Sequence, residues 1–405
     1  MKKFNYGWII VGMGLLVKMA ALGFGRFTYP MLIPRMRESL GLQYVEMGLL
    51  SGGILLGYLL FSFIGGALAT RLGSKRVVIV SLLCSSFCMF GMSQASQFSF
   101  LLFLTFGLGA GAAGAHIAMT TLPMAWFERR SLGKALGIVT GGTGVGVILT
   151  GLLIPPLLLS PGGEGWRGCW GLMGFMTLGV ALTGVILLKE RPERIDLISF
   201  SASKRKEGSS HPAKAGTLSL RLIILVYFIF GLAYNIYATY FVAFMVEDLR
   251  VAEKMAGVIW SLFGWTSMGS GLAWGYISDH VGRKKALLWN NGLISLALLL
   301  PLCLHPPVIL GLSSFLFGLT FLGTVTIIAA AVGEQVSEKK ATVYGLVTLI
   351  HGVGQFLGTT SGGYLKDLTG SFNLTLLVSF VGFLLCLVLV AFGGKPRRSM
   401  IEREE

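Results

Sequence analysis

The feature that most constrains this chain is a series of apolar runs of about 20 residues that recurs along almost its whole length. A helix of about 20 residues crosses the roughly 30 Å hydrocarbon core of a bilayer. Backbone groups in lipid must be satisfied internally, and the alternating ten-residue strands of a membrane barrel are not seen. We therefore expect an all-α membrane protein. Its twelve transmembrane helices are expected near 7–34, 45–69, 76–93, 98–126, 133–157, 167–188, 219–246, 255–278, 285–303, 307–332, 341–365 and 372–394.

The composition supports a protein that lies largely in lipid. Hydrophobic residues make up 54% of the chain, charged residues only 13%, and the mean hydropathy is +0.76. Soluble domains carry about 25% charged residues. The first span follows Met1, Lys2 and Lys3, but it is too long for a signal peptide and lacks a small-residue cleavage site, so we expect it to be retained.

The distribution of lysine and arginine predicts the orientation of the chain. With a cytoplasmic N-terminus, cytoplasmic segments carry 25 of the 33 cations, the opposite loops carry six, and two lie inside the first span. Because cations concentrate on the cytoplasmic side, we expect a multi-pass protein of the cytoplasmic (inner) membrane with both termini in the cytoplasm. The formal net charge of +15 then reflects loops that face an anionic leaflet, and we expect no nucleic-acid partner.

The chain reads as two halves of one design, separated by a polar segment rich in charge, serine and glycine. GALATRLGSKR (66–76) matches GYISDHVGRKK (275–285), and GIVTGGTGVG (137–146) matches GLVTLIHGVG (345–354), both at an offset of about 208 residues. Two matches at one offset indicate an internal repeat. We expect a six-helix bundle over 1–189, a cytoplasmic linker over 190–218, a second six-helix bundle over 219–394, and a cytoplasmic tail over 395–405.

These loops resemble those of the major facilitator superfamily of secondary transporters. The pattern GxxxxxxGxK[RK] after spans 2 and 8, the twelve spans and the basic linker carry the resemblance, which covers the full chain. It implies two bundles rocking about a substrate site near the midplane. It also implies a gating role for residues of the two loops: Gly66, Arg71, Gly73, Lys75, Arg76, Gly275, Asp279, Gly282, Arg283 and Lys284.

Local stretches resemble particular branches of the superfamily. WFERRSLGKALGIVTGGTGVG (126–146), GWRGCWGLMG (165–174) and GGYLKDLTGSF (362–372) are similar to stretches of oxalate:formate exchangers and monocarboxylate carriers. GFGRF of the first span looks like a little-characterised bacterial branch. The chain departs from these patterns because Thr70 replaces the usual acidic residue of the first loop, and span 8 lacks the cation that oxalate and monocarboxylate carriers have there.

Two cations lie inside the first span, while all 18 carboxylates lie in loops, tails or at helix ends. Counted from Trp8, Lys18 is about 15 Å deep, where a lipid-facing charge costs at least about 2.5–3.5 kcal/mol. On a helical wheel Arg26 lies about 80° from Lys18, so both can address one cavity. The alternatives are that Lys18 fixes packing through a carbonyl or hydroxyl group and that Arg26 reaches only the interface.

The resemblance extends to the position of Arg26. In monocarboxylate carriers a lysine of the first span follows the opening tryptophan by 18 residues, which is also the spacing from Trp8 to Arg26. The repeat pairs Arg26 with Tyr234 of span 7. The expected substrate-binding residues are Lys18, Arg26, Tyr29, Tyr234, Asn235 and Gln355, although aromatic residues of span 7 also serve helix packing.

Two histidines are embedded in spans, His116 in span 4 and His351 in span 11. Histidine titrates near physiological pH, so in the absence of embedded carboxylates these residues are the proton-coupling candidates. The alternative is a hydrogen-bonded histidine at a helix contact. Gln355 lies one turn from His351 on the same side of the helix.

We therefore expect a secondary active transporter that moves a small organic anion, monocarboxylate-like, by alternating access, proton-coupled or by exchange, and working as a monomer. An exporter of hydrophobic or cationic drugs fits the Met-rich and aromatic spans, but usually needs an embedded acid. A non-cycling, transporter-like sensor is a further alternative. We expect no enzyme, cofactor or metal site, since there is no nucleophile and base pair and no His or carboxylate beside the cysteines.

Overall fold

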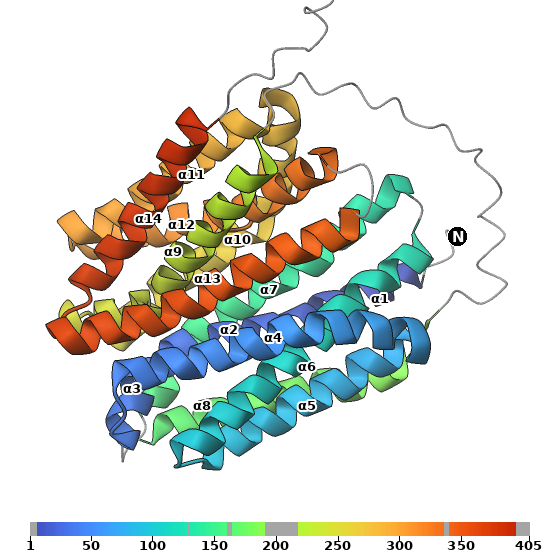
Figure 1. Ribbon diagram of the computed structural model, residues 1–405. Helices are drawn as coiled ribbons and strands as arrows, with labels where there is room; N and C mark the ends of the chain where they lie inside the picture. Colours follow the sequence, from blue (N-terminus) through green and yellow to red (C-terminus); the bar gives the residue numbers. More distant parts are fainter. Residues whose placement is uncertain (1–5, 128, 160–163, 191–217, 336–339, 394–405) are drawn as a thin grey trace, which may run out of the picture.

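The computed structural model describes residues 6–127, 129–159, 164–190, 218–335 and 340–393, and long helices that lie side by side make up almost all of this part (Figure 1). Most of the expected linker, residues 191–217, and the expected tail, residues 395–405, lie outside the described residues. The first apolar segment runs without interruption through four elements. These are α1 (Gly7–Lys18), the π-helix η1 (Met19–Phe24), α2 (Gly25–Phe27) and α3 (Tyr29–Leu40).

Each of the other expected spans coincides with a long helix. They are α4 (Tyr44–Leu72), α5 (Ser74–Gln94), α6 (Phe98–Trp126), α7 (Arg129–Leu158), α8 (Gly165–Leu187), α9 (Leu220–Ala243) continued by the π-helix η3 (Phe244–Asp248), α10 (Glu253–Val281), α11 (Arg283–Cys303), α12 (Pro307–Gln335), α13 (Lys340–Thr369) and α14 (Asn373–Phe392). Ten of these twelve segments are long and apolar enough to cross a membrane; the other two, α10 and α13, match them in length.

The repeat seen in the sequence is present in the backbone. The helices α4, α5 and α6 have 29, 21 and 29 residues, as do α10, α11 and α12, and each begins 209 residues before its counterpart. The turns between the first two helices of each set also match, because Gly73 and Gly282 both have φ 90° with ψ 145° and 152°. Only glycine adopts this conformation without strain, so the sequence match reflects a shared backbone requirement.

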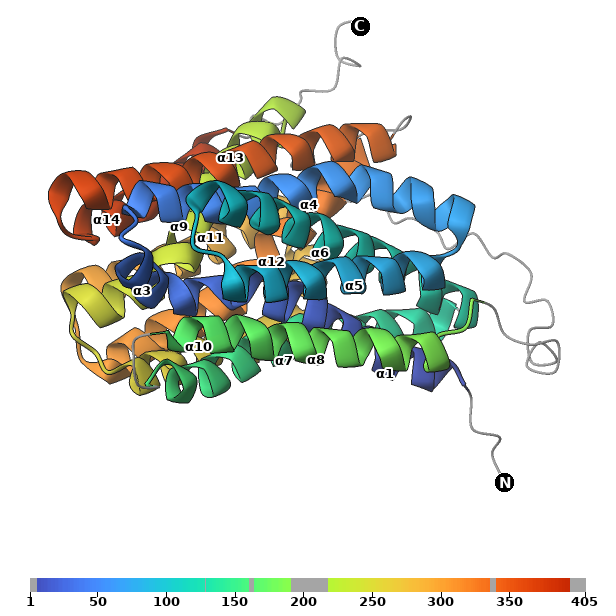
Figure 2. The same ribbon diagram turned by 90° about the horizontal axis from the view of Figure 1, so that it is seen from below.

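Helices from the two ends of the chain meet along a common seam. In Figure 1 the helices α1 to α8, blue to green, fill the lower part and α9 to α14, yellow-green to red, the upper part, and Figure 2 shows α4 and α13 side by side. The seam consists of α7 against α10, α4 against α13 and α3 against α9. Glycines allow the close approach: a Cβ on Gly257 would lie 2.1 Å from the Gly151 carbonyl oxygen, and one on Gly48 would lie 2.5 Å from that of Thr359.

The long helices have two distinct ends. At one end, which we call the basic end, the α4–α5 and α10–α11 turns carry Arg71, Lys75, Arg76 and residues 283–285. At the other end, the mouth end, α3 finishes beside the starts of α4 and α10. Between the ends, large apolar side chains such as Phe87 and Phe103 are exposed by 74% and 69%, which suits helices that face hydrocarbon.

Candidate functional site

Arg26 of α2 connects the two parts of the chain. Its Nη2 atom donates to the hydroxyl oxygen of Tyr234 at 2.7 Å, to Oδ1 of Asn235 at 3.1 Å and to Oε1 of Gln355 at 3.3 Å. Tyr234 and Asn235 belong to α9 and Gln355 belongs to α13. The structure therefore brings together four of the six residues expected to bind substrate, from opposite sides of the seam.

The charge of Arg26 has no acidic partner among the described residues. Their ion pairs lie at the helix ends, and the three acceptors of Arg26 are neutral. One nitrogen makes all three bonds, while Nε and Nη1 make no hydrogen bond to any described residue. The rings of Phe27 and Tyr234, each 5.7 Å from the guanidinium carbon, add a weak cation–π attraction. Arg26 therefore retains donors and positive charge for an anion.

An aromatic stack supports the polar cluster on the α9 side. The rings of Tyr227, Phe230 and Tyr234 follow one another along α9, and the imidazole of His351 stacks on Tyr227 with centroids 4.0 Å apart and planes at 6°. His351 Nδ1 lies 3.0 Å from the Tyr227 carbonyl oxygen, and its Nε2 lies 2.6 Å from Nε2 of Gln355. Packing and hydrogen bonding thus fix the histidine in one orientation beside the Arg26 cluster.

The other expected binding residues point elsewhere. Lys18 is 3% exposed and its Nζ donates to the Thr120 hydroxyl at 2.9 Å, while the Tyr29 hydroxyl donates to the Met47 carbonyl oxygen at 2.7 Å. The helical wheel assumed a regular α-helix between Lys18 and Arg26. The intervening segment is a π-helix, in which each residue advances by a smaller angle, so the angle on a regular wheel does not apply. Lys18 contacts α6, whereas Arg26 contacts α9 and α13.

His116 also lies apart from the Arg26 cluster. It is on α6, its ring meets the Tyr58 ring edge-on with centroids 6.0 Å apart, and its buried Nδ1 has no hydrogen-bond partner among the described residues. The Thr120 hydroxyl that receives the Lys18 amine donates in turn to the His116 carbonyl oxygen at 2.8 Å. Lys18 and His116 therefore belong to one polar group inside the α1–α8 part, and the proton-carrying role of His116 stays a prediction.

Small voids follow the first segment from Arg26 toward the mouth end. A cavity of about 20 Å³ lies against Arg26, Phe27 and Pro30, and one of about 10 Å³ lies further along, against Met31 and Pro34. The first has room for about one water molecule. A larger cavity of about 690 Å³, which we call the mouth, follows at Pro34 and Arg35. In this conformation the space beside Arg26 is too small for a bound substrate.

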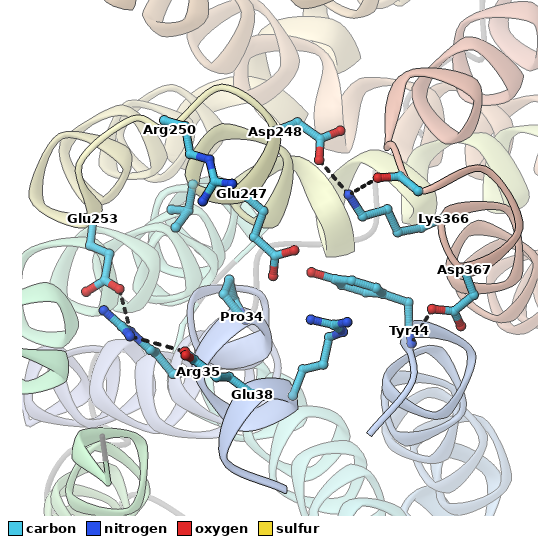
Figure 3. A pocket seen from close by; sticks show the side chains of 13 residues that line it. Pro34, Arg35, Glu38, Tyr44, Glu247, Asp248, Arg250, Glu253, Lys366 and Asp367 are labelled. Atoms are coloured by element: carbon cyan, nitrogen blue, oxygen red, sulfur yellow. Dashed lines mark hydrogen bonds and ion pairs between the residues drawn. The ribbon is translucent and has the colours of Figure 1, made fainter. Parts of the chain in front are cut away.

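Ionic contacts cross the seam at the mouth. Figure 3 shows Arg35 between Glu253 and Glu38: its Nε donates to Glu253 Oε1 at 2.7 Å, across the seam, and its Nη1 to Glu38 on its own helix at 3.2 Å. Asp367 of α13 accepts from the backbone N–H groups of Tyr44 at 2.9 Å and of Val45 at 2.7 Å, which places a carboxylate at the start of α4. These contacts hold the mouth end together.

Sequence reasoning missed the pair of Arg35 with Glu253 and the contact of Asp367 with α4. The only signal was that these charges lie at span ends on the same side of the membrane. Nothing in a single sequence pairs the end of span 1 with the start of span 8.

At the basic end, the expected gating residues that have hydrogen-bond partners find them within their own part of the chain. The backbone N–H of Lys75 donates to Glu190 Oε1 at 2.6 Å, and the Lys75 Nζ donates to the Val185 carbonyl oxygen at 2.7 Å. Thr70, which lacks the acid of its counterpart, donates to the Gly66 carbonyl oxygen at 3.0 Å. Glu190 thus supplies the carboxylate for this turn.

In the second loop the acid, Asp279, pairs with Arg283. Arg283 donates to Asp279 at 2.6 Å and to Glu334 of α12 at 2.7 Å, and Lys284 donates to the Ala391 carbonyl oxygen at 2.9 Å. A Cβ on Gly66 would meet Ile117, and one on Gly275 would meet Thr326, at ordinary contact distances. The remaining members of the expected set, Arg71 and Arg76, are exposed. Their gating role stays a prediction.

Several curated proteins of similar sequence are named as transporters of acids. The chain is 24% identical to the hexuronate transporter of Bacillus subtilis (strain 168) over 84% of this chain and 83% of that protein. It is 25% identical to the probable sulfoacetate transporter SauU of Cupriavidus necator, over 85% and 84%. It is 26% identical to monocarboxylate transporter 13 of Rattus norvegicus, over 78% and 72%.

A solved structure shares the fold. The crystal structure of a bacterial homolog of the human lysosomal transporter Spinster, in an inward-facing and occupied conformation, superposes with a TM-score of 0.77 over 97% of each chain at 14% identity. The model of the family described as "Uncharacterised MFS-type transporter YbfB" matches residues 18–391. The chain therefore belongs to this family of major facilitator superfamily transporters and is a membrane transport protein, not an enzyme.

Proposed function

We propose that the protein is a secondary active transporter that carries a small organic anion of the monocarboxylate kind across the cytoplasmic membrane by alternating access. Its twelve long helices form two six-helix bundles, 1–189 and 219–394, joined by the linker 190–218, with both termini in the cytoplasm. The monomer is the working unit, and Arg26 receives the negative charge of the substrate.

The observation that carries this proposal is the uncompensated charge of Arg26 at the seam. A charge buried within a membrane protein is costly unless it is paired, and Arg26 has only neutral acceptors among the described residues. A carboxylate supplies the missing charge and fits the planar guanidinium fork with two parallel bonds. The donors on Nε and Nη1, which have no partner among the described residues, are available to such a carboxylate.

The chemistry of the relatives supports an acidic substrate. Hexuronate and sulfoacetate, named for two of them, both carry a carboxylate, as do monocarboxylates. The proteins differ in the rest of the substrate, so the shared element is the anionic group. An arginine that stands alone between the two bundles is suited to that element, whereas the rest of the molecule is recognised by other groups.

The contrast between the site and the mouth supports alternating access. The cavity at Arg26 is about 20 Å³, while the mouth beyond it is about 690 Å³ and is crossed by the Arg35–Glu253 pair. Substrate entry therefore requires the bundles to separate along the seam. A helix contact made through glycines, as between α7 and α10, has little interlocking side-chain bulk to oppose that movement.

A drug exporter is the weaker alternative. Binding a hydrophobic cation normally requires an acid in the membrane, and the described carboxylates lie at helix ends or in loops. A non-cycling sensor would need no coupling between binding and net movement of solute. Direct measurement of transport separates these functions.

The test is uptake by purified protein in liposomes, offered labelled lactate, glucuronate, sulfoacetate and a lipophilic cation. We expect uptake or exchange of at least one carboxylate and loss of this activity in Arg26→Gln. Tyr237→Phe is the control, because the Tyr237 hydroxyl bonds to Ser313 within the second bundle at 2.6 Å. Transport of the cation alone, or normal carboxylate transport by Arg26→Gln, would refute the proposal.

A further inference from the structure

Chemistry fixes the direction of every hydrogen bond in the row Arg26, Gln355, His351. A guanidinium can only donate, so Gln355 presents its carbonyl Oε1 to Arg26 at 3.3 Å. Its amide nitrogen therefore faces His351 Nε2 at 2.6 Å and donates to it. The other ring nitrogen, Nδ1, lies 3.0 Å from the Tyr227 carbonyl oxygen, which only accepts, so Nδ1 carries the proton. In this state His351 is neutral, with Nε2 unprotonated.

Protonation of His351 reverses this row. A proton on Nε2 turns the acceptor into a donor that faces the donor amide nitrogen of Gln355. The conflict is removed when the amide of Gln355 turns over and offers Oε1 to His351, since its two ends have nearly the same shape. The amide nitrogen then faces Arg26, and two donors point into the same space beside the guanidinium.

We propose that Gln355 links a proton on His351 to the anion on Arg26. A carboxylate between Arg26 and the reversed amide accepts from both, so the row is fully bonded either with neutral His351 and no anion or with protonated His351 and anion bound. With protonated His351 and no anion, two donors face each other. With neutral His351, a carboxylate between Arg26 and Gln355 faces Oε1, so two acceptors face each other. Binding of the proton and of the anion is therefore mutually favourable, as the reciprocity of linked equilibria requires.

The groups around a protonated His351 provide no negative charge, so the bound anion is the group that balances its positive charge. From α9, His351 meets Tyr227 and, with ring centroids 6.5 Å apart, Tyr234. Across the seam, Arg26 faces it through Gln355. None of these groups is a carboxylate. Because a proton and a monovalent anion arrive together, the net charge of the site stays that of Arg26 alone.

This inference rests on the proposed function and assigns Gln355 as a positioning residue. It adds that transport is symport of one proton with each anion, and that His351 carries the proton. It also explains why the site holds an amide at 355: a carboxylate there would neutralise Arg26, and an apolar side chain would separate His351 from the anion. Both Gln355 and His351 are buried, with 9% and 6% of their surface exposed, so bulk water cannot replace the amide as the link.

The test measures how the affinity of the purified full-length protein for a carboxylate depends on pH. The carboxylate used is whichever of lactate, glucuronate and sulfoacetate binds most tightly. Between about pH 5 and 8, we expect wild-type affinity to rise on acidification with a slope that approaches about tenfold per pH unit, the limit for one linked proton. We expect the slope to vanish in His351→Asn and in Gln355→Leu, which keeps the histidine but removes the amide. His116→Asn, a matched change of the other embedded histidine, should keep the slope.

A second readout needs no variant. In weakly buffered solution, wild-type protein should take up close to one proton for each carboxylate bound. Absence of proton uptake, a flat wild-type profile or a full slope in Gln355→Leu would each overturn the linkage. These outcomes differ from failure of the proposed function, in which none of the three carboxylates binds at any pH.

Discussion

Arg26 and Tyr234, which the sequence repeat pairs with each other, are hydrogen-bonded at 2.7 Å across the seam and lie 208 residues apart. The cation of α2 and the phenol of α9 meet at the seam. For a carrier whose bundles rock against each other, this is where a bound substrate stays in contact with both.

The Tyr234 hydroxyl should contribute directly to anion affinity. In Tyr234→Phe the site loses one hydrogen bond. The net contribution of one hydrogen bond is about 0.5–1.5 kcal/mol, so we expect the affinity for the anion to fall by about 2- to 13-fold. Tyr237→Phe removes a hydroxyl that is equally buried on the same helix but bonds to Ser313, so it should leave affinity unchanged. Titration of carboxylate binding measures both, and equal losses would argue against a role for Tyr234 at the site.

Lys18 should matter less to anion binding than Arg26. Its amine is bonded to Thr120 inside the first bundle, and among the described residues it has no bond across the seam. We expect Lys18→Gln to weaken carboxylate binding by less than about threefold through the reduced positive potential alone, well below the effect of Arg26→Gln. A larger loss in Lys18→Gln than in Arg26→Gln would contradict this ranking of the two cations.

The Arg35–Glu253 pair should control access from the mouth. In Arg35→Ala the ionic contact across the seam is lost, so conformations with an open mouth gain population. We expect a cysteine introduced at Thr239, which lines the small cavity, to react several-fold faster with a membrane-impermeant thiol reagent.

The control for this experiment is Glu38→Gln, which breaks the contact of Arg35 with a residue on its own helix and leaves the seam intact. It should leave the labelling rate near that of the parent. Equal acceleration in both variants would mean that general loosening, not the crossing pair, exposes the cavity.

Gly282 should be required for its backbone conformation alone. With φ 90° it is in a region that other residues rarely adopt, yet a Cβ there would meet no atom within 4 Å. Gly282→Ala should therefore lower stability by about 1–3 kcal/mol through strain. Gly269 also has open space around its Cβ position but lies in a helix, so Gly269→Ala should not lower stability. Thermal unfolding of both variants in detergent provides the comparison.

The positions of the helices follow from the sequence because hydrophobic length is a local property. All twelve expected segments coincide with helices, and the short turns expected between two pairs of them lie at Gly73 and Gly282. The two residues that the repeat pairs, Arg26 and Tyr234, also lie in contact. The role of these residues in binding stays a prediction until it is measured.

Other parts of the site depend on features that a single sequence does not show. The π-helix Met19–Phe24 changes the direction of Lys18 relative to Arg26, and no residue type in this apolar stretch predicts a π-helix. The orientation of the Gln355 amide depends on both of its neighbours. Its Oε1 faces Arg26 and its Nε2 faces His351, and these two residues come from opposite sides of the seam. The Arg35–Glu253 pair likewise joins residues 218 positions apart.

The measurement that tests the central claim most directly compares a carboxylate with its neutral amide. Purified wild type, Arg26→Lys and Arg26→Gln are titrated with lactate or glucuronate, whichever binds the wild type more tightly, and with the matching neutral carboxamide. We expect wild type to prefer the acid by at least tenfold, Arg26→Lys to keep part of this preference, and Arg26→Gln to lose it. An undiminished preference for the acid in Arg26→Gln would contradict the assignment of Arg26 as the anion site.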